Sequence, residues 1–150
     1  EGMAKERRIQ VETDADDFLI CADARQMEEL FTNLLSNAVK YNLDGGRVWL
    51  SLKKERKDMV LIVSDNGVGI PKESLGRIFE RFYRVDKGRS RKQGGTGLGL
   101  SIVKHIVNFY HGTVKVVSSQ EEGKRGTSFI VRLPIAKEQT GPLIQNRNCG

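Results

Sequence analysis

The sequence contains few of the residues that build metal clusters and disulfide scaffolds, and it has no long apolar run. Among 150 residues there are 2 cysteines, 2 histidines and 3 prolines. Cys21 and Cys149 form no metal-ligand spacing and no redox motif. No apolar run approaches the roughly 20 residues of a membrane-spanning helix. These absences argue against a zinc module, a thiol redox centre and a helix that spans a membrane.

The composition is that of one globular domain, with 38% hydrophobic and 29% charged residues. A chain of this length can bury a sizeable core. The net charge is +6, but much of the excess is local. Six cations lie on the approach to a glycine-rich loop: Arg81, Arg84, Lys87, Arg89, Arg91 and Lys92. This clustering suits a compact anion, and we find no helix patterned to read DNA, so no nucleic-acid partner is expected.

The glycine-rich loop is the most unusual stretch, with four glycines between Gly94 and Gly99. An amphipathic helical pattern follows at once, and Gly112 stands where a left-handed helix cap is expected. A helix that starts in such a loop presents free backbone N–H groups at its partially positive end, which suits an anion. From the glycines alone, a flexible loop before a core helix is an equally good interpretation.

A second helix is predicted after Asp23, a candidate N-cap, from apolar residues spaced three and four apart as far as Ala38. Along the edge of its apolar face runs a polar stripe of Asn33, Asn37, Lys40 and Tyr41. Asparagine is a mediocre helix former, so two amides one turn apart beside an apolar stripe are unusual, and a binding role would explain them. The alternative is that they are simply exposed.

The apolar run from Met59 to Ser64 is predicted to be a central strand, and Asp65-Asn-Gly-Val-Gly-Ile70 follows it directly. A carboxylate at a strand end could accept a hydrogen bond from the exocyclic amine of a base. The alternative is an ordinary structural turn.

The order of elements predicts an α+β two-layer sandwich rather than a doubly wound sheet, because strands and helices do not alternate regularly. Strands are expected at 8–13, 18–21, 47–53, 59–64, 113–118 and 127–133, a short helix at 75–82 and a mobile basic loop at 85–96. We expect residues 1–7 to end a preceding element, residues 8–135 to form the domain, and residues 136–150 to be a flexible tail.

Five segments in this order resemble one family. They are Asn-Leu-Leu-Ser-Asn-Ala-Val-Lys-Tyr (33–41), Asp-Asn-Gly-Val-Gly-Ile (65–70), Ile-Phe-Glu-Arg-Phe-Tyr-Arg (78–84), Gly-Gly-Thr-Gly-Leu-Gly-Leu-Ser-Ile-Val (94–103) and Gly-Thr-Ser-Phe (126–129). The set is similar to the N, G1, F, G2 and G3 boxes of the catalytic ATP-binding domain of bacterial sensor histidine kinases. The resemblance implies a Bergerat (GHKL-type) fold, in which helices pack on one face of a mixed sheet and a mobile lid covers ATP.

Roles for individual residues come from the same resemblance. Asn37 is expected to bind Mg²⁺, Lys40 and Arg84 to act on the phosphates with it, and Asp65 to hold the adenine amine. The remaining nucleotide-binding residues that the resemblance implies are Asn33, Tyr41, Gly67, Gly69, Ile70, Gly95, Thr96, Gly97, Leu98, Gly99, Leu100 and Thr127. The implied cofactors are therefore ATP and Mg²⁺.

Asn33 stands where related ATP-hydrolysing proteins of the superfamily carry a glutamate base, and an amide cannot take up a proton. The family's phosphate acceptor is a histidine on a separate dimerisation domain, and neither His105 nor His111 fits that pattern. We therefore expect this chain, as a monomer, to bind ATP without phosphorylating itself. Its expected partners are the dimerisation domain and, indirectly, a response regulator.

The resemblance also implies a location in the bacterial cytoplasm, as part of a membrane-anchored receptor, with no membrane contact by this domain. Two alternatives stay open at this point. One is a serine kinase of the anti-sigma-factor type, which shares the boxes. The other is a nucleotide-sensing interaction module that has lost catalysis.

Overall fold

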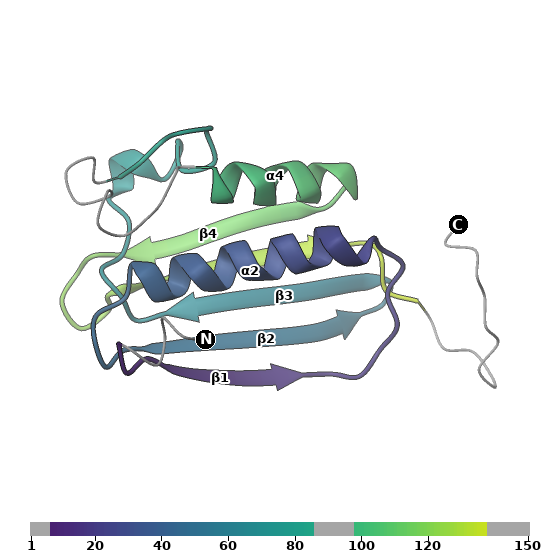
Figure 1. The fold of residues 1–150 in the computed structure, drawn as a ribbon, viewed down its shortest axis with the longest axis horizontal. Helices are drawn as coiled ribbons and strands as arrows, with labels where there is room; N and C mark the ends of the chain where they lie inside the picture. Colours follow the sequence, from purple (N-terminus) through teal and green to yellow (C-terminus); the bar gives the residue numbers. More distant parts are fainter. Residues whose placement is uncertain (1–6, 86–97, 138–150) are drawn as a thin grey trace.

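The computed structural model describes residues 7–85 and 98–137, which form one five-stranded mixed sheet covered on one face by two helices (Figure 1). The strands are β1 (Gln10–Ala15), β2 (Arg47–Glu55), β3 (Asp58–Asp65), β4 (Thr113–Ser119) and β5 (Gly126–Leu133). Their order across the sheet is β1-β2-β3-β5-β4, in which only the β1–β2 pair is parallel. This confirms the predicted α+β sandwich with its helices on one face.

Helix α2 (Ala24–Lys40) begins at its predicted N-cap, because an Asp23 carboxylate oxygen accepts the Gln26 N–H at 3.1 Å. Its buried face includes Leu30 and Leu34, both fully buried. Each such leucine contributes roughly 1.5–3 kcal/mol when it leaves water. The apolar periodicity of the sequence therefore fixes which side of α2 lies on the sheet.

Helix α4 (Gly99–Phe109) packs beside α2 over the same face of the sheet (Figure 1). The Tyr110 hydroxyl accepts the Asp23 N–H at 2.9 Å and donates to the Gln26 side chain at 2.5 Å. The end of α4 is thereby tied to the start of α2, so the two helices lie antiparallel. Consequently the start of α4 and the end of α2 lie at the same edge of the sheet.

Two short elements differ from the sequence-based expectation. The expected strand at 18–21 is a single bridge between Ile20 and Ala136. The expected helix at 75–82 is instead the 3₁₀ helix η1 (Lys72–Ser74) followed by consecutive turns, which end at Phe82 with a φ of 66°. Phe79 makes an edge-to-face contact with Phe129 at 6.2 Å between ring centroids. The apolar spacing at 75–82 therefore serves to anchor a turn segment on the sheet.

The expected left-handed cap at Gly112 is also wrong. The residue with positive φ is His111, at 59°, and Gly112 is needed for a different reason. A Cβ on Gly112 would lie 2.3 Å from the Arg132 carbonyl oxygen. Glycine is required there because β4 starts in close contact with β5.

The limits predicted for the domain stay predictions. Ala136, which the sequence places in the tail, is 7% exposed and donates its N–H to the Lys57 carbonyl at 2.8 Å. Arg7, which the sequence places in a preceding element, contacts the end of α2 with its side chain. Most of the predicted basic loop at 85–96, and the predicted tail from 138 onward, lie outside the described residues.

Candidate functional site

A cavity of about 690 Å³ opens at the edge of the sheet where α2 and β3 end and α4 begins. Figure 1 shows these three ends on the same side of the molecule, although their residues are far apart in the sequence. The cavity is lined by most of the predicted site residues: Asn33, Asn37, Lys40, Tyr41, Asp65, Gly69, Ile70, Arg84, Gly99, Leu100 and Thr127. Five separate sequence segments therefore contribute to one concave site.

Asp65, the last residue of β3, is the most perturbed acid in the part of the chain that the structure describes. Burial raises its pKa to about 6, against the opposing effect of hydrogen bonds from the Gly67 and Thr127 N–H groups. The Gly67 bond measures 2.9 Å from N to Oδ1. A partly desolvated carboxylate in a cavity is a strong, directional acceptor, which suits an amine-bearing ligand.

The backbone around Asp65 is packed so closely that glycine is required. A Cβ on Gly67 would lie 2.4 Å from the Tyr41 carbonyl oxygen, and one on Gly126 would lie 2.1 Å from the Asp65 carbonyl oxygen. The Val68 N–H donates to the same Tyr41 oxygen at 3.1 Å. The loop after β3 is therefore held directly against the end of α2.

A hydroxyl chain supports the other side of this loop. The Ser118 Oγ accepts the Ile70 N–H at 2.7 Å and lies 2.7 Å from the Oγ1 of Thr127. Thr127 is 6% exposed and pairs with Asp65 across the β3–β5 ladder. The side chain of Thr127 is thus fixed beside the carboxylate, at the wall of the cavity.

The second half of the site lies between the two helices. The first turn of an α-helix leaves N–H groups without partners inside the helix, and those of α4 begin at Gly99 beside the cavity. A Cβ on Gly99 would lie 3.0 Å from the Asn33 Oδ1. The amide stripe of α2 therefore faces the positive end of α4, and Lys40 and Arg84 add two cations to the lining.

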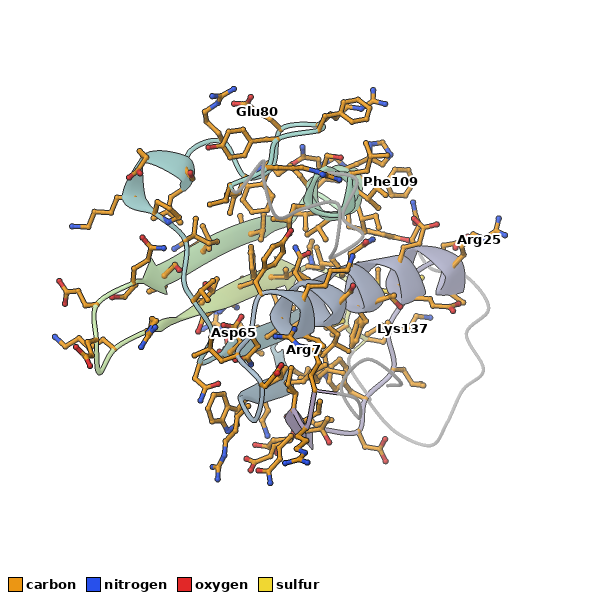
Figure 2. All side chains as sticks on the ribbon, turned by 60° about the vertical axis from the view of Figure 1, so that its left-hand side comes forward. Arg7, Arg25, Asp65, Glu80, Phe109 and Lys137 are labelled. Carbon is orange, nitrogen blue, oxygen red and sulfur yellow. The ribbon has the colours of Figure 1, made fainter. Side chains whose placement is uncertain are left out.

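The cavity omits some predicted site residues and includes others that were not predicted as site residues. Gly67 and Leu98 lie outside its lining, and Gly95, Thr96 and Gly97 lie outside the described residues. The additional lining residues are Arg7, Ser36, Asn42, Leu43, Asp44, Val68, Ile78, Tyr83, Val85, Gln120 and Phe129. Five of them, Ser36, Val68, Ile78, Tyr83 and Phe129, belong to the quoted segments. Arg7 carried no local signal, because it reaches the site only through tertiary packing (Figure 2).

Comparison with known proteins agrees with this geometry. Residues 22–137 match the model of the family described as histidine kinase-, DNA gyrase B- and HSP90-like ATPase. The chain belongs to this family. Membership implies ATP binding, and it confirms the resemblance read from the five sequence segments.

The curated relatives of this ATPase-family chain are sensor kinases. It is 42% identical over 125 residues to the sensor histidine kinase WalK of Bacillus subtilis, covering 82% of this chain and 20% of WalK. It is 43% identical over 116 residues to the sensor protein CiaH of Streptococcus pneumoniae, covering 77% of this chain and 26% of CiaH. The chain thus spans about a fifth to a quarter of the length of these relatives.

Solved structures show the same fold. The mycobacterial sensor histidine kinase MprB superposes with a TM-score of 0.78 at 29% identity, over 92% of this chain and 91% of that one. Full-length ShkA, solved in complex with AMPPNP, gives a TM-score of 0.73 at 28% identity, over 93% of this chain and 28% of ShkA.

None of the helices placed in residues 7–85 and 98–137 has the length and apolar content to cross a bilayer. Nor does that part of the chain hold a group of three or more His, Cys, Asp or Glu residues arranged to bind a metal ion.

Proposed function

We propose that this chain is the ATP-holding catalytic part of a sensor histidine kinase. It binds Mg²⁺-ATP with the base at Asp65 and the phosphates between α2 and α4, and it presents the γ-phosphate to a histidine on another domain. One observation carries the proposal: the desolvated Asp65 carboxylate and the N-terminus of α4 open into a single cavity. The first suits the adenine amine, and the second suits a polyphosphate.

ATP fits the cavity in one orientation. The negative charge of Asp65 repels phosphates, whereas Lys40, Arg84 and the start of α4 attract them. Tyr41 lies on the lining next to Lys40, where its ring can cover the base or the sugar. The AMPPNP bound to ShkA, a structural neighbour, supports a nucleotide of this kind as the ligand.

Asn37 is the residue that would hold Mg²⁺. Its side-chain oxygen is a hard ligand on the cavity wall, and the described residues offer no cluster of carboxylates to bind a metal ion instead. This donor set fits Mg²⁺, which typically takes one or two protein ligands and completes its shell with phosphates and water. Bound there, the ion would neutralise charge on the phosphates.

The chemistry of the site favours transfer to a side chain over hydrolysis. Asn33 lies one turn before Asn37 and beside Gly99, and its amide cannot deprotonate a water molecule. Catalysis then depends on positioning and on charge neutralisation by Lys40 and Arg84. Both histidines are exposed and neither lines the cavity, so the acceptor would come from another domain.

The partners and location follow from the relatives, which are multidomain sensor kinases longer than this chain. We propose that the acceptor histidine lies on a dimerisation domain of the same protein and that a response regulator receives the phosphoryl group. We propose a cytoplasmic location within a membrane-anchored receptor.

The test begins with calorimetric titration of the chain with ATP, with and without Mg²⁺, followed by incubation with γ-labelled ATP. We expect Mg²⁺-dependent binding, no self-labelling and negligible hydrolysis. Adding an acceptor-domain fragment from the longer protein should then label that fragment on histidine. Steady hydrolysis would favour an ATPase, binding followed by transfer to serine would favour the anti-sigma-factor type of kinase, and absence of binding would refute the proposal.

A further inference from the structure

Arg7 is the least expected residue on the cavity wall. Its side chain is 25% exposed and reaches from the segment before β1 to the end of α2. The guanidinium donates to three backbone carbonyls, those of Val39, Lys40 and Asn42, and its Nε pairs with Asp44 at 3.0 Å. Figure 2 shows Arg7 at the end of α2 that lies near Asp65, opposite the end at which Arg25 is labelled.

The Val39 and Lys40 carbonyls belong to the last turn of α2, where C=O groups lose their regular partners inside the helix, and the Asn42 carbonyl lies just beyond it. The Val39 carbonyl also accepts the Asn42 N–H at 3.2 Å, so Arg7 adds a second donor there. A cation there also complements the negative end of the helix dipole. The planar fork of arginine can bond several carbonyls at once in a fixed geometry, whereas a lysine ammonium acts as a point charge on a flexible stem. Arg7 therefore fixes the direction in which the chain leaves α2.

The direction in which the chain leaves α2 determines where the loop after β3, which contains Gly67 and Val68, lies. The Tyr41 carbonyl accepts the Val68 N–H at 3.1 Å. A Cβ on Gly67 would lie 2.4 Å from that oxygen and 2.8 Å from the Asn42 Cα, so the two segments are in direct contact. The Gly67 N–H in turn bonds Asp65 Oδ1 at 2.9 Å. A shift of Tyr41 and Asn42 would move Gly67 and change the hydrogen bond to Asp65.

We propose that Arg7 is a positioning residue for the base end of the nucleotide site. It acts through the carbonyls at the end of α2 and the Gly67–Val68 loop, and it sets the affinity for the adenosine part of the ligand. Direct hydrogen bonding to the phosphates is not its role, because the Asp44 carboxylate and three carbonyls already accept from the guanidinium. The inference rests on the proposed function for its ligand, but its structural step can be tested without one.

The test compares Arg7→Met and Arg7→Lys with Asp23→Ala. Asp23 caps the opposite end of α2, so its loss destabilises the same helix far from the cavity. Binding of ATP, ADP and AMP is measured by calorimetry, and stability by urea unfolding. We expect Arg7→Met to weaken all three nucleotides by a similar factor of about ten, Arg7→Lys to recover little of it, and Asp23→Ala to leave affinity unchanged.

A second readout needs no nucleotide. Amide hydrogen exchange at Val68 and Gly67 should accelerate in both Arg7 variants and stay as in the unmutated chain in Asp23→Ala. If Arg7→Met does not fold, the inference is tested on Arg7→Lys alone, by comparing its nucleotide affinity and its exchange rates at Val68 and Gly67 with those of the unmutated chain.

Three outcomes would overturn the inference. They are unchanged affinity and exchange in a folded Arg7 variant, a loss confined to ATP and ADP with AMP spared, and full recovery by lysine. The first would mean a merely structural contact, and the other two a charge effect on the phosphates. Failure of the unmutated chain to bind ATP would refute the proposed function instead, and the exchange rates would still test the role of Arg7.

Discussion

Replacing Asp65 with asparagine should make the domain more stable while weakening its affinity for ATP. Burial raises the pKa of Asp65 from 3.8 to about 6. Because the folded state holds this proton more tightly than the unfolded state, the stability it contributes is complete below pH 3.8 and is lost as pH rises through about 6. A shift of about two units corresponds to roughly 3 kcal/mol.

Partial solvent screening of the side chain reduces that figure, so we expect Asp65→Asn to gain about 1–2 kcal/mol at pH 8. The amide oxygen can still accept the Gly67 N–H, whose bond to the carboxylate measures 2.9 Å. Its NH₂ group, however, cannot accept from an adenine amine. Loss of a hydrogen bond to a charged group, about 1.5–3 kcal/mol, predicts a tenfold to hundredfold weaker affinity for ATP.

The assay is urea unfolding of both proteins between pH 4 and pH 8, with ATP calorimetry on each. The gain should be largest at pH 8 and should shrink towards pH 4, where the unmutated side chain is itself protonated. Asp17→Asn is the matched control, since Asp17 is exposed and lies outside the cavity lining. Equal stability at pH 8, or a gain that does not depend on pH, would refute the reasoning.

Three further expectations follow from the site. ATP affinity should fall about tenfold per pH unit below pH 6, because only ionised Asp65 accepts from the adenine amine; calorimetry from pH 5 to pH 8, corrected for the ligand's own protonation, measures it, and a flat profile contradicts it. Asn37→Ala should remove most of the Mg²⁺ dependence of ATP affinity, which parallel titrations with Mg²⁺ and EDTA would show. Gly67→Ala should cost about 1–3 kcal/mol in urea unfolding, because its Cβ would lie 2.4 Å from the Tyr41 oxygen, whereas Gly76→Ala meets no atom within 4 Å and should change little.

The sequence predicts the sheet and the long helices well because their patterns are locally complete. Alternation in β2, the continuous apolar run of β3 and the three-and-four spacing of α2 each indicate an element and what it buries before any tertiary contact forms. The apolar residues at 75–82 have helical spacing, which predicts a helix that the structure does not form. Packing of Phe79 against Phe129 draws the segment into turns instead, and that contact is not visible in a local pattern.

The site also contains residues that local motifs reveal and residues that only tertiary packing brings to the cavity. Asn33, Asn37 and Asp65 stand in recognisable motifs, so the sequence places them at the cavity, although their roles stay predictions. Arg7 cannot be found this way, because its interactions join residues more than thirty positions apart. The pKa of Asp65 is likewise a tertiary property, since it arises from the desolvation that the surrounding loop and β5 impose.

The two ends of the cavity impose opposite demands on charge, and this opposition explains how one ligand orientation can be selected. In the proposed binding mode, Lys40, Arg84 and the start of α4 hold the phosphates at one end, while the buried carboxylate of Asp65 holds the base at the other. A reversed nucleotide would bring its phosphates against that carboxylate and leave its base among cations. Because desolvation strengthens both the repulsion and the attraction, the burial that raises the pKa of Asp65 also sharpens the choice of orientation. In the proposed binding mode, the instability of an ionised Asp65 is therefore the cost of directing the γ-phosphate away from the base site.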